Sequence, residues 1–167
     1  MHYEFKTIKM KKLLLVLSLL LVVVVSCKPK EKVANTTIAR KSSVAIKGNW
    51  TITSVTYPGS DYIKVTSFDL ADSKCMVGST WKFISNNNSG TMAMTASGCP
   101  SYETKITWYV NKEEQFILKF LDENKAKKVK EGYILKVAEQ SENSFQLLDG
   151  INVGGKMVNV VYQFTKA

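Results

Sequence analysis

Histidine and cysteine are scarce in this chain of 167 residues, and both scarcities narrow the functions it can have. The one histidine, His2, lies in an N-terminal segment that we interpret below as removed. Its loss excludes general bases that depend on histidine, Ser-His-Asp triads and most zinc sites. Each of the three cysteines has a predicted role that leaves no thiol as a nucleophile. We therefore expect no enzyme.

The remaining signs of chemistry are equally sparse. There is no glycine-rich phosphate loop, and Gly154-Gly155 is typical of a turn. Several carboxylates fall in predicted turns, where solvated surface charge is the simpler interpretation: Glu113, Glu114, Asp122 and Glu123. We expect no metal site and no cofactor.

The N-terminus has the pattern of a secretion signal. An apolar run from Leu13 to Val25, interrupted only by Ser18, follows a lysine-rich start. The run is shorter than the ~20 apolar residues that span a bilayer, so a cleaved signal over residues 1–26 is the better interpretation. Val24-Val25-Ser26-Cys27 resembles the lipobox of bacterial lipoproteins. This predicts lipidation of Cys27, with palmitate-like chains that hold the protein on a membrane; an ordinary signal peptide with an incidental Cys27 is the alternative.

Most of the positive charge lies near the N-terminus. Residues 1–26 hold four lysines and one glutamate, and residues 27–41 hold five basic residues and one glutamate, so seven of the nine net positive charges lie there. The rest of the chain is nearly neutral, which argues against binding nucleic acid. Residues 27–46 are polar, and we interpret them as a lipidated anchor and flexible tether. Lys28 follows the anchor where an aspartate would favour inner-membrane retention, so we expect attachment to the outer membrane, on either face.

Alternation of apolar and polar residues predicts an all-β domain over residues 47–167. The expected strands are Gly48–Tyr57, Ser79–Ser85, Gly90–Ala96, Tyr102–Val110, Gln115–Leu121, Gly132–Ala138, one that begins near Ser144, and Lys156–Thr165. Eight strands with short connections favour an antiparallel up-and-down barrel, because closure removes exposed edges. Two details are less determined: one short helix over Tyr62–Leu70, and the extent of the seventh strand around Asp149–Gly155.

Gly48-Asn49-Trp50 opens the first strand and resembles the lipocalin signature. With the lipobox, the cysteine pair and the chain length, the sequence is similar to lipocalin-like domain lipoproteins of the Bacteroidetes type. The resemblance covers residues 47–167 and implies an eight-stranded calycin barrel. It also implies that Gly48 and Trp50 are structural, with the tryptophan packed across the closed end.

In such a barrel the longer connections, over residues 58–78, 97–101, 122–131 and 149–155, meet at the open end. Cys75 and Cys99 lie in the first two of them. Exported proteins favour disulfides, so we predict a Cys75–Cys99 bond that fixes the first long connection to the barrel mouth. Two free thiols are the alternative.

Two functional classes remain open. The first is a barrel that binds a small apolar or amphipathic molecule, with the candidate lining Phe83, Met92, Met94, Trp108, Phe120, Leu135 and Tyr162. The first long connection carries Tyr62, Ile63, Val65, Phe68 and Leu70, and we expect it to act as a lid. The alternative to a ligand cavity is a barrel that these large side chains fill completely. The second class is a protein-interaction barrel, such as a periplasmic inhibitor or an envelope assembly accessory, that acts through its open-end loops. A loop with Lys125, Lys127, Lys128 and Lys130 would serve an acidic partner or an anionic headgroup, or simply be solvated. The sequence identifies neither a ligand nor an oligomeric state.

Overall fold

The computed structural model describes residues 41–60, 64–121 and 132–167. The predicted signal peptide, Cys27 and the lysine-rich loop lie outside these residues. Within the described ranges, no helix has the length and apolar character needed to cross a membrane.

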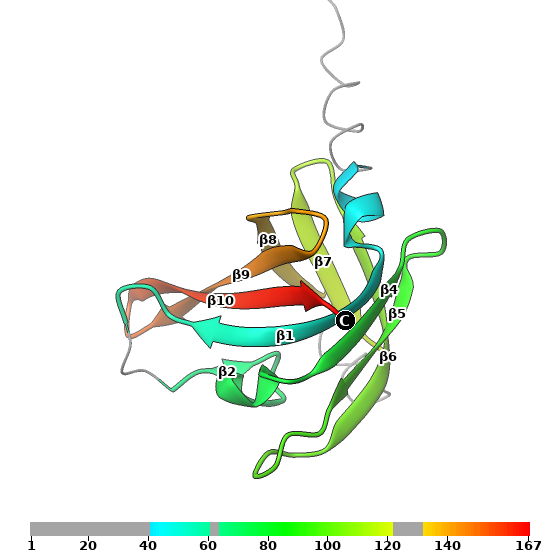
Figure 1. Cartoon of the computed structure of the whole chain (residues 1–167). Helices are drawn as coiled ribbons and strands as arrows, with labels where there is room; N and C mark the ends of the chain where they lie inside the picture. The colour runs from blue at the N-terminus through cyan, green and yellow to red at the C-terminus, as the bar shows by residue number, and fades with distance from the viewer. Residues whose placement is uncertain (1–40, 61–63, 122–131) are drawn as a thin grey trace, which may run out of the picture. The chain divides into compact units, whose positions relative to one another are not determined.

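Eight antiparallel strands form a closed barrel (Figure 1). They are β1 (Gly48–Thr56), β4 (Thr80–Ile84), β5 (Ser89–Met94), β6 (Tyr102–Val110), β7 (Gln115–Phe120), β8 (Tyr133–Ala138), β9 (Ser144–Val153) and β10 (Lys156–Lys166). Each strand from β4 to β10 pairs with the next along the chain, and β1 closes the barrel by pairing with both β4 and β10. The predicted all-β, eight-stranded, up-and-down barrel is confirmed.

The strands form where large apolar residues alternate with polar ones, because successive side chains of a strand point to opposite faces. In β4 the side chains of Trp81 and Phe83 are buried while Lys82 between them is exposed. In β10 every second residue from Val158 to Phe164 is buried. The buried set forms one continuous apolar core inside the barrel.

The hairpin between β9 and β10 differs from the prediction. We expected a longer connection over Asp149–Gly155, but β9 continues to Val153 and the turn is Gly154-Gly155. Both glycines have positive φ, +60° and +87°, which a two-residue hairpin turn requires and which glycine adopts without steric cost. Asp149 and Gly150 are therefore strand residues, paired with Val160 and Asn159.

The segment between β1 and β4 also differs from the prediction. The short helix expected over Tyr62–Leu70 is wrong for its described part. Residues 66–72 form a small ribbon, β2 (Thr66–Ser67) paired with β3 (Ala71–Asp72), followed by the 3₁₀ turn η1 (Ser73–Met76). Phe68 and Asp69 at the tip have φ of +52° and +50°, the left-handed region that a right-handed helix cannot contain.

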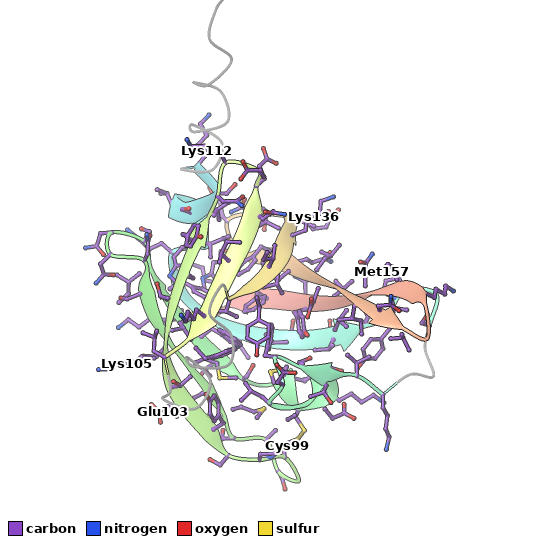
Figure 2. All side chains as sticks on the ribbon, turned by 180° about the vertical axis from the view of Figure 1, so that it is seen from behind. Cys99, Glu103, Lys105, Lys112, Lys136 and Met157 are labelled. Carbon is purple, nitrogen blue, oxygen red and sulfur yellow. A yellow bond between two sulfur atoms is a disulfide. The ribbon has the colours of Figure 1, made fainter. Side chains whose placement is uncertain are left out.

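At the N-terminal side, residues 41–46 form a short helix rather than a flexible tether. Ile46 at its end is fully buried in the barrel core, and burial of this one apolar side chain fixes the segment. Figure 1 shows this helix and the β2–η1 segment at opposite ends of the barrel. In the view from behind, Lys112 lies near one end and Cys99 near the other (Figure 2).

Candidate functional site

The structure brings all seven predicted lining residues together inside the barrel. Phe83, Met92, Met94, Trp108, Phe120, Leu135 and Tyr162 are each 2 % exposed or less. They come from six strands, and the period-two pattern places each on the inner face. Whether they contact a ligand remains a prediction.

The half of the barrel next to the first residues of β1 is a packed aromatic core. Phe83 lies with its ring centroid 5.1 Å from that of Trp108 and 5.7 Å from that of Phe116. Phe145 and Phe164 stack at 4.5 Å. Phe116, Phe145 and Phe164 are absent from the predicted lining set, although their alternation also points them inward.

Trp50 closes this end. Its indole N–H donates to the carbonyl oxygen of Ile46 at 2.7 Å, and its ring meets the edge of Phe145 with centroids 4.7 Å apart. The side chain is 1 % exposed. Gly48 has φ +133°, a conformation that L side chains rarely adopt, which explains glycine at the start of the motif. Trp50 packs across the closed end as the resemblance implies.

The other end is covered by residues 64–78, which we call the lid. Phe68 at the lid tip is 4 % exposed. Its ring lies among four rings that line the barrel, with centroid distances of 6.3 Å to Trp81, 5.6 Å to Phe120, 5.2 Å to Tyr133 and 5.3 Å to Tyr162. Phe68 therefore fills the barrel mouth from above. The sequence predicted an apolar lid, but not that one of its side chains enters the barrel.

Hydroxyl groups hold the lid in place. Tyr133 donates to the carbonyl oxygen of Phe68 at 2.7 Å, and the hydroxyls of Tyr162 and Ser67 are 2.6 Å apart. The hydroxyls of Tyr57 and Ser73 also form a hydrogen bond. Each of these three hydrogen bonds joins the hydroxyl of a tyrosine outside the lid to an oxygen atom of the lid. These contacts satisfy polar groups that closure of the lid buries.

A disulfide fastens the far end of the lid. Cys75 in η1 and Cys99 in the β5–β6 connection are bonded, with Cα atoms 5.7 Å apart. The predicted pairing is confirmed. Because η1 carries the bond, the part of the lid next to Cys75 stays attached to the barrel even if Phe68 moves.

Asp149 is an acidic residue of the barrel wall that acts on the tyrosines at this closed mouth. Burial raises the pKa of its carboxyl group. Burial also raises the pKa of Tyr133 and of Tyr162. For Tyr133 the charge and hydrogen bond of Asp69 come next, and the charge of Asp149 makes a smaller contribution to both tyrosines. Sequence reasoning missed Asp149 because Asp-Gly is such a strong turn signal.

The sequence profile of the family described as "Lipocalin-like domain" matches residues 46–147, more than half of the chain. This chain belongs to the lipocalin-like domain family. Members of the family are generally binding proteins rather than enzymes.

Three solved structures are similar in fold to this lipocalin-like chain. A lipocalin-like protein from Bacteroides uniformis aligns with TM-score 0.44 and 14 % identity, over 74 % of this chain and 99 % of that one. Bovine odorant binding protein in complex with a selenium-containing odorant aligns with TM-score 0.43 and 7 % identity, over 75 % of this chain and 72 % of that one. The deswapped triple mutant of the bovine odorant binding protein aligns with TM-score 0.40 and 10 % identity, over 74 % of each chain. None of the curated proteins matches the chain.

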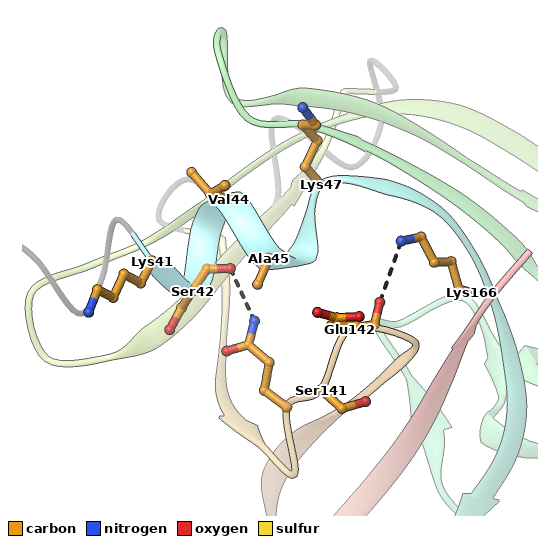
Figure 3. A pocket seen from close by; sticks show the side chains of 9 residues that line it. Lys41, Ser42, Val44, Ala45, Lys47, Ser141, Glu142 and Lys166 are labelled. Atoms are coloured by element: carbon orange, nitrogen blue, oxygen red, sulfur yellow. Dashed lines mark hydrogen bonds between the residues drawn. The ribbon is translucent and has the colours of Figure 1, made fainter.

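Outside the lipocalin-like barrel, a groove of about 610 Å³ runs between the 41–46 helix and the β8–β9 turn (Figure 3). Gln140 donates to the carbonyl oxygen of Ser42 at 3.2 Å, and Lys166 reaches the carbonyl oxygen of Glu142 at 3.5 Å. The first contact attaches the helix to the β8–β9 turn, and the second joins that turn to β10, so the groove has a structural explanation. Among the described residues, no cluster of three His, Cys, Asp or Glu side chains could hold a metal ion.

Proposed function

We propose that this chain is an exported lipoprotein, held on the outer membrane by acyl chains on Cys27, whose lipocalin-like barrel binds one small apolar or amphipathic molecule. The family, the barrel and its apolar inner face support the binding role. The lipobox-like Val24-Val25-Ser26-Cys27 supports the anchor.

The observation that carries the binding proposal is the position of Phe68. Its ring occupies an aromatic pocket built by the barrel, yet it belongs to a separate segment that is attached by side-chain hydrogen bonds, by buried apolar side chains such as Met76, and by one disulfide. Phe68 also adopts a left-handed backbone conformation, which costs a non-glycine residue about 1–2 kcal/mol. A ligand with an aromatic or alkyl group could replace the Phe68 ring, and the lid would then relax this strain.

Binding can be tested on the chain from Lys28 onward, the proposed mature protein without its acylated residue. This piece contains the compact unit Ala34–Ala167 and needs no detergent. Titration with the uncharged probe N-phenyl-1-naphthylamine should show saturable binding with a stoichiometry near one. Met94 is an inward residue at the mouth end of β5, and Met94→Trp should block binding while circular dichroism shows an intact barrel.

The second candidate, a protein-interaction barrel, is favoured by the dense packing of the interior. The rings of Phe83, Trp108 and Phe116 contact one another without space for a guest at the closed end. A barrel filled throughout predicts no probe uptake by the wild type. It also predicts strong destabilisation, about 2–5 kcal/mol, when Met94 is replaced by alanine.

The anchor is tested separately. Wild-type protein should partition into detergent and carry the mass of its acyl chains, whereas Cys27→Ala should lose both properties because the acylated sulfur is gone. The same mass shift and the same partitioning in the Cys27→Ala protein would refute the lipoprotein assignment.

A further inference from the structure

Asp149 is an acidic residue on the inner face of β9, where the other inward side chains are apolar. Phe145 and Leu147, two and four positions earlier in β9, are buried in the core, and alternation puts Asp149 on the same face. Its partner across the hairpin is Val160, which is fully buried. The carboxylate therefore points toward the interior at the mouth end of the barrel.

Two tyrosines at the mouth lie on the same inner face as Asp149. Tyr162 lies two positions along β10 from Val160, the partner of Asp149, and its side chain is on the same inner face. The charge of Asp149 is a minor cause of the raised pKa of Tyr162 and of Tyr133, whose rings both lie beside that of Phe68. Within the described ranges, no side chain donates a hydrogen bond to the Asp149 carboxylate, and burial alone accounts for its raised pKa. The Asp149 side chain is half-buried, so it is partly shielded from water and open to a cation that enters the mouth.

The closed lid forms hydrogen bonds with the polar groups that could otherwise bind a ligand at the mouth. The hydroxyls of Tyr133 and Tyr162 are bonded to the carbonyl oxygen of Phe68 and to Ser67. Moving the lid would free both hydroxyls next to Asp149 and vacate the place of the Phe68 ring. The opened mouth would then combine an apolar aromatic pocket, two hydroxyls and one carboxylate.

We propose that the barrel prefers ligands with a protonated amine at one end of an apolar body, with Asp149 binding the ammonium group and the place of Phe68 receiving the apolar part. This inference rests on the proposed function and names the class of ligand. A charge-assisted hydrogen bond to a carboxylate is about twice as strong as one between neutral groups. The faces of Tyr133, Tyr162 and Trp81 would add cation–π attraction.

The same arrangement disfavours anionic ligands. A fatty-acid carboxylate placed at Asp149 would meet a like charge in a partly buried site, which is destabilising. Asp69 on the lid tip adds a second carboxylate, whose Oδ2 lies 3.2 Å from the Tyr133 hydroxyl. With the lid closed, Asp69 and Asp149 therefore both act on Tyr133.

The test is a competition experiment with octylamine, octanol and octanoate, each displacing N-phenyl-1-naphthylamine from the chain from Lys28 onward. Octylamine should bind roughly tenfold or more tightly than octanol, the factor expected for one hydrogen bond to a charged group. Octanoate should bind most weakly. Asp149→Asn should remove the amine preference, so that octylamine and octanol compete about equally. Glu103→Gln, which removes an exposed carboxylate from the outer face of β6 (Figure 2), should keep it.

The outcomes separate the two claims. Equal binding of the three compounds by the wild type, tighter octanoate, or an amine preference that survives in Asp149→Asn would overturn the amine proposal and leave the binding function standing. Absence of any saturable displacement would overturn both. If Asp149→Asn does not fold, the ranking of the three compounds on the wild type still decides the amine proposal.

Discussion

Gly90 marks a place where the barrel wall allows no side chain. An added Cβ would lie 2.0 Å from the carbonyl oxygen of Lys82 and 3.1 Å from Cγ1 of Ile106. The first contact is with backbone of the neighbouring strand, which cannot move without disturbing the β4–β5 pairing. Glycine is required here by close approach and not by backbone conformation.

Gly90→Ala should therefore lower the free energy of unfolding by about 3 kcal/mol, through overpacking of the barrel wall. Gly150→Ala is the matched control. Gly150 also lies in a strand, but its added Cβ would meet only Met157 Cε at 3.4 Å and Asn159 Oδ1 at 3.8 Å. Urea unfolding should show a change of about 0.5 kcal/mol or less for the control. Equal losses in both variants would contradict this explanation.

The raised pKa of Asp149 predicts a pH-dependent stability. The folded protein holds this proton more tightly than the unfolded chain, whose ordinary value is 3.8, so the favourable contribution is complete below pH 3.8 and is lost as pH rises through the folded pKa. Asp149→Asn cannot ionise and escapes this loss. Tyr133 and Tyr162 do not interfere, because both ionise only at alkaline pH.

The Asp149→Asn variant should therefore unfold at a higher temperature than the wild type at pH 7, and the two melting temperatures should converge near pH 3. Thermal scans by circular dichroism across this range measure the difference. A variant less stable than the wild type at pH 7 would show that the ionised carboxylate is stabilised by a partner.

At the scale of elements, the lid differs from the barrel in how it is stabilised. Side-chain hydrogen bonds, buried side chains and a disulfide hold it, and few strand-to-strand hydrogen bonds contribute. Its ribbon has two paired positions, Thr66 with Asp72 and Ser67 with Ala71. The barrel strands are longer and each is paired on both sides. We therefore expect the lid to open more readily than the barrel unfolds.

Removing the disulfide tests this difference. Cys75 and Cys99 are 24 residues apart, and loss of such a link lowers the free energy of unfolding by about 3 kcal/mol. In the Cys75→Ser, Cys99→Ser variant, amide exchange should accelerate most at lid positions such as Leu70 and Ser73, whose N–H groups bond to Ser67 and Val65. Barrel amides should accelerate only as far as global stability falls. Lid amides that exchange no faster than β6 amides would contradict the lid interpretation.

The strands could be predicted because period-two alternation reports directly which face is buried. All seven lining residues follow from that rule, whereas the position of Trp50 was implied by the resemblance of Gly48-Asn49-Trp50 to the lipocalin signature. The predictions failed where tertiary contacts decide the local structure. Phe68 and Asp69 take a left-handed conformation that suits entry of the Phe68 ring into the barrel, and the local pattern around Tyr62–Leu70 contains no sign of it.

Two further differences have the same origin. Asp149-Gly150 and Gly154-Gly155 are both good turn sequences, and only the pairing of the whole hairpin selects the second. Residues 41–46 are too polar to predict as structured, yet Ile46 is buried and accepts the hydrogen bond of Trp50. Asp149 became visible as a site residue only after the extent of β9 was known.

At the scale of the whole barrel, the two ends have different characters. The Trp50 end is packed with aromatic rings and closed by the chain itself. The other end is closed by a separate segment that buries several apolar side chains, with Phe68 among the rings of the barrel, and is held by tyrosine hydroxyls and a disulfide. Binding would therefore be confined to the lid end, while the Trp50 end supplies stability.

The central claim is that a ligand takes the place of the Phe68 ring, and fluorine NMR can observe that ring directly. 4-Fluorophenylalanine placed at position 68 should give one resonance with little response to solvent deuterium in the free protein, because the side chain is 4 % exposed. On addition of saturating N-phenyl-1-naphthylamine, the account predicts a new resonance that responds to solvent deuterium. Met94→Trp should prevent this change. A resonance that stays buried while the probe is bound would contradict the claim that ligand and Phe68 compete for one place.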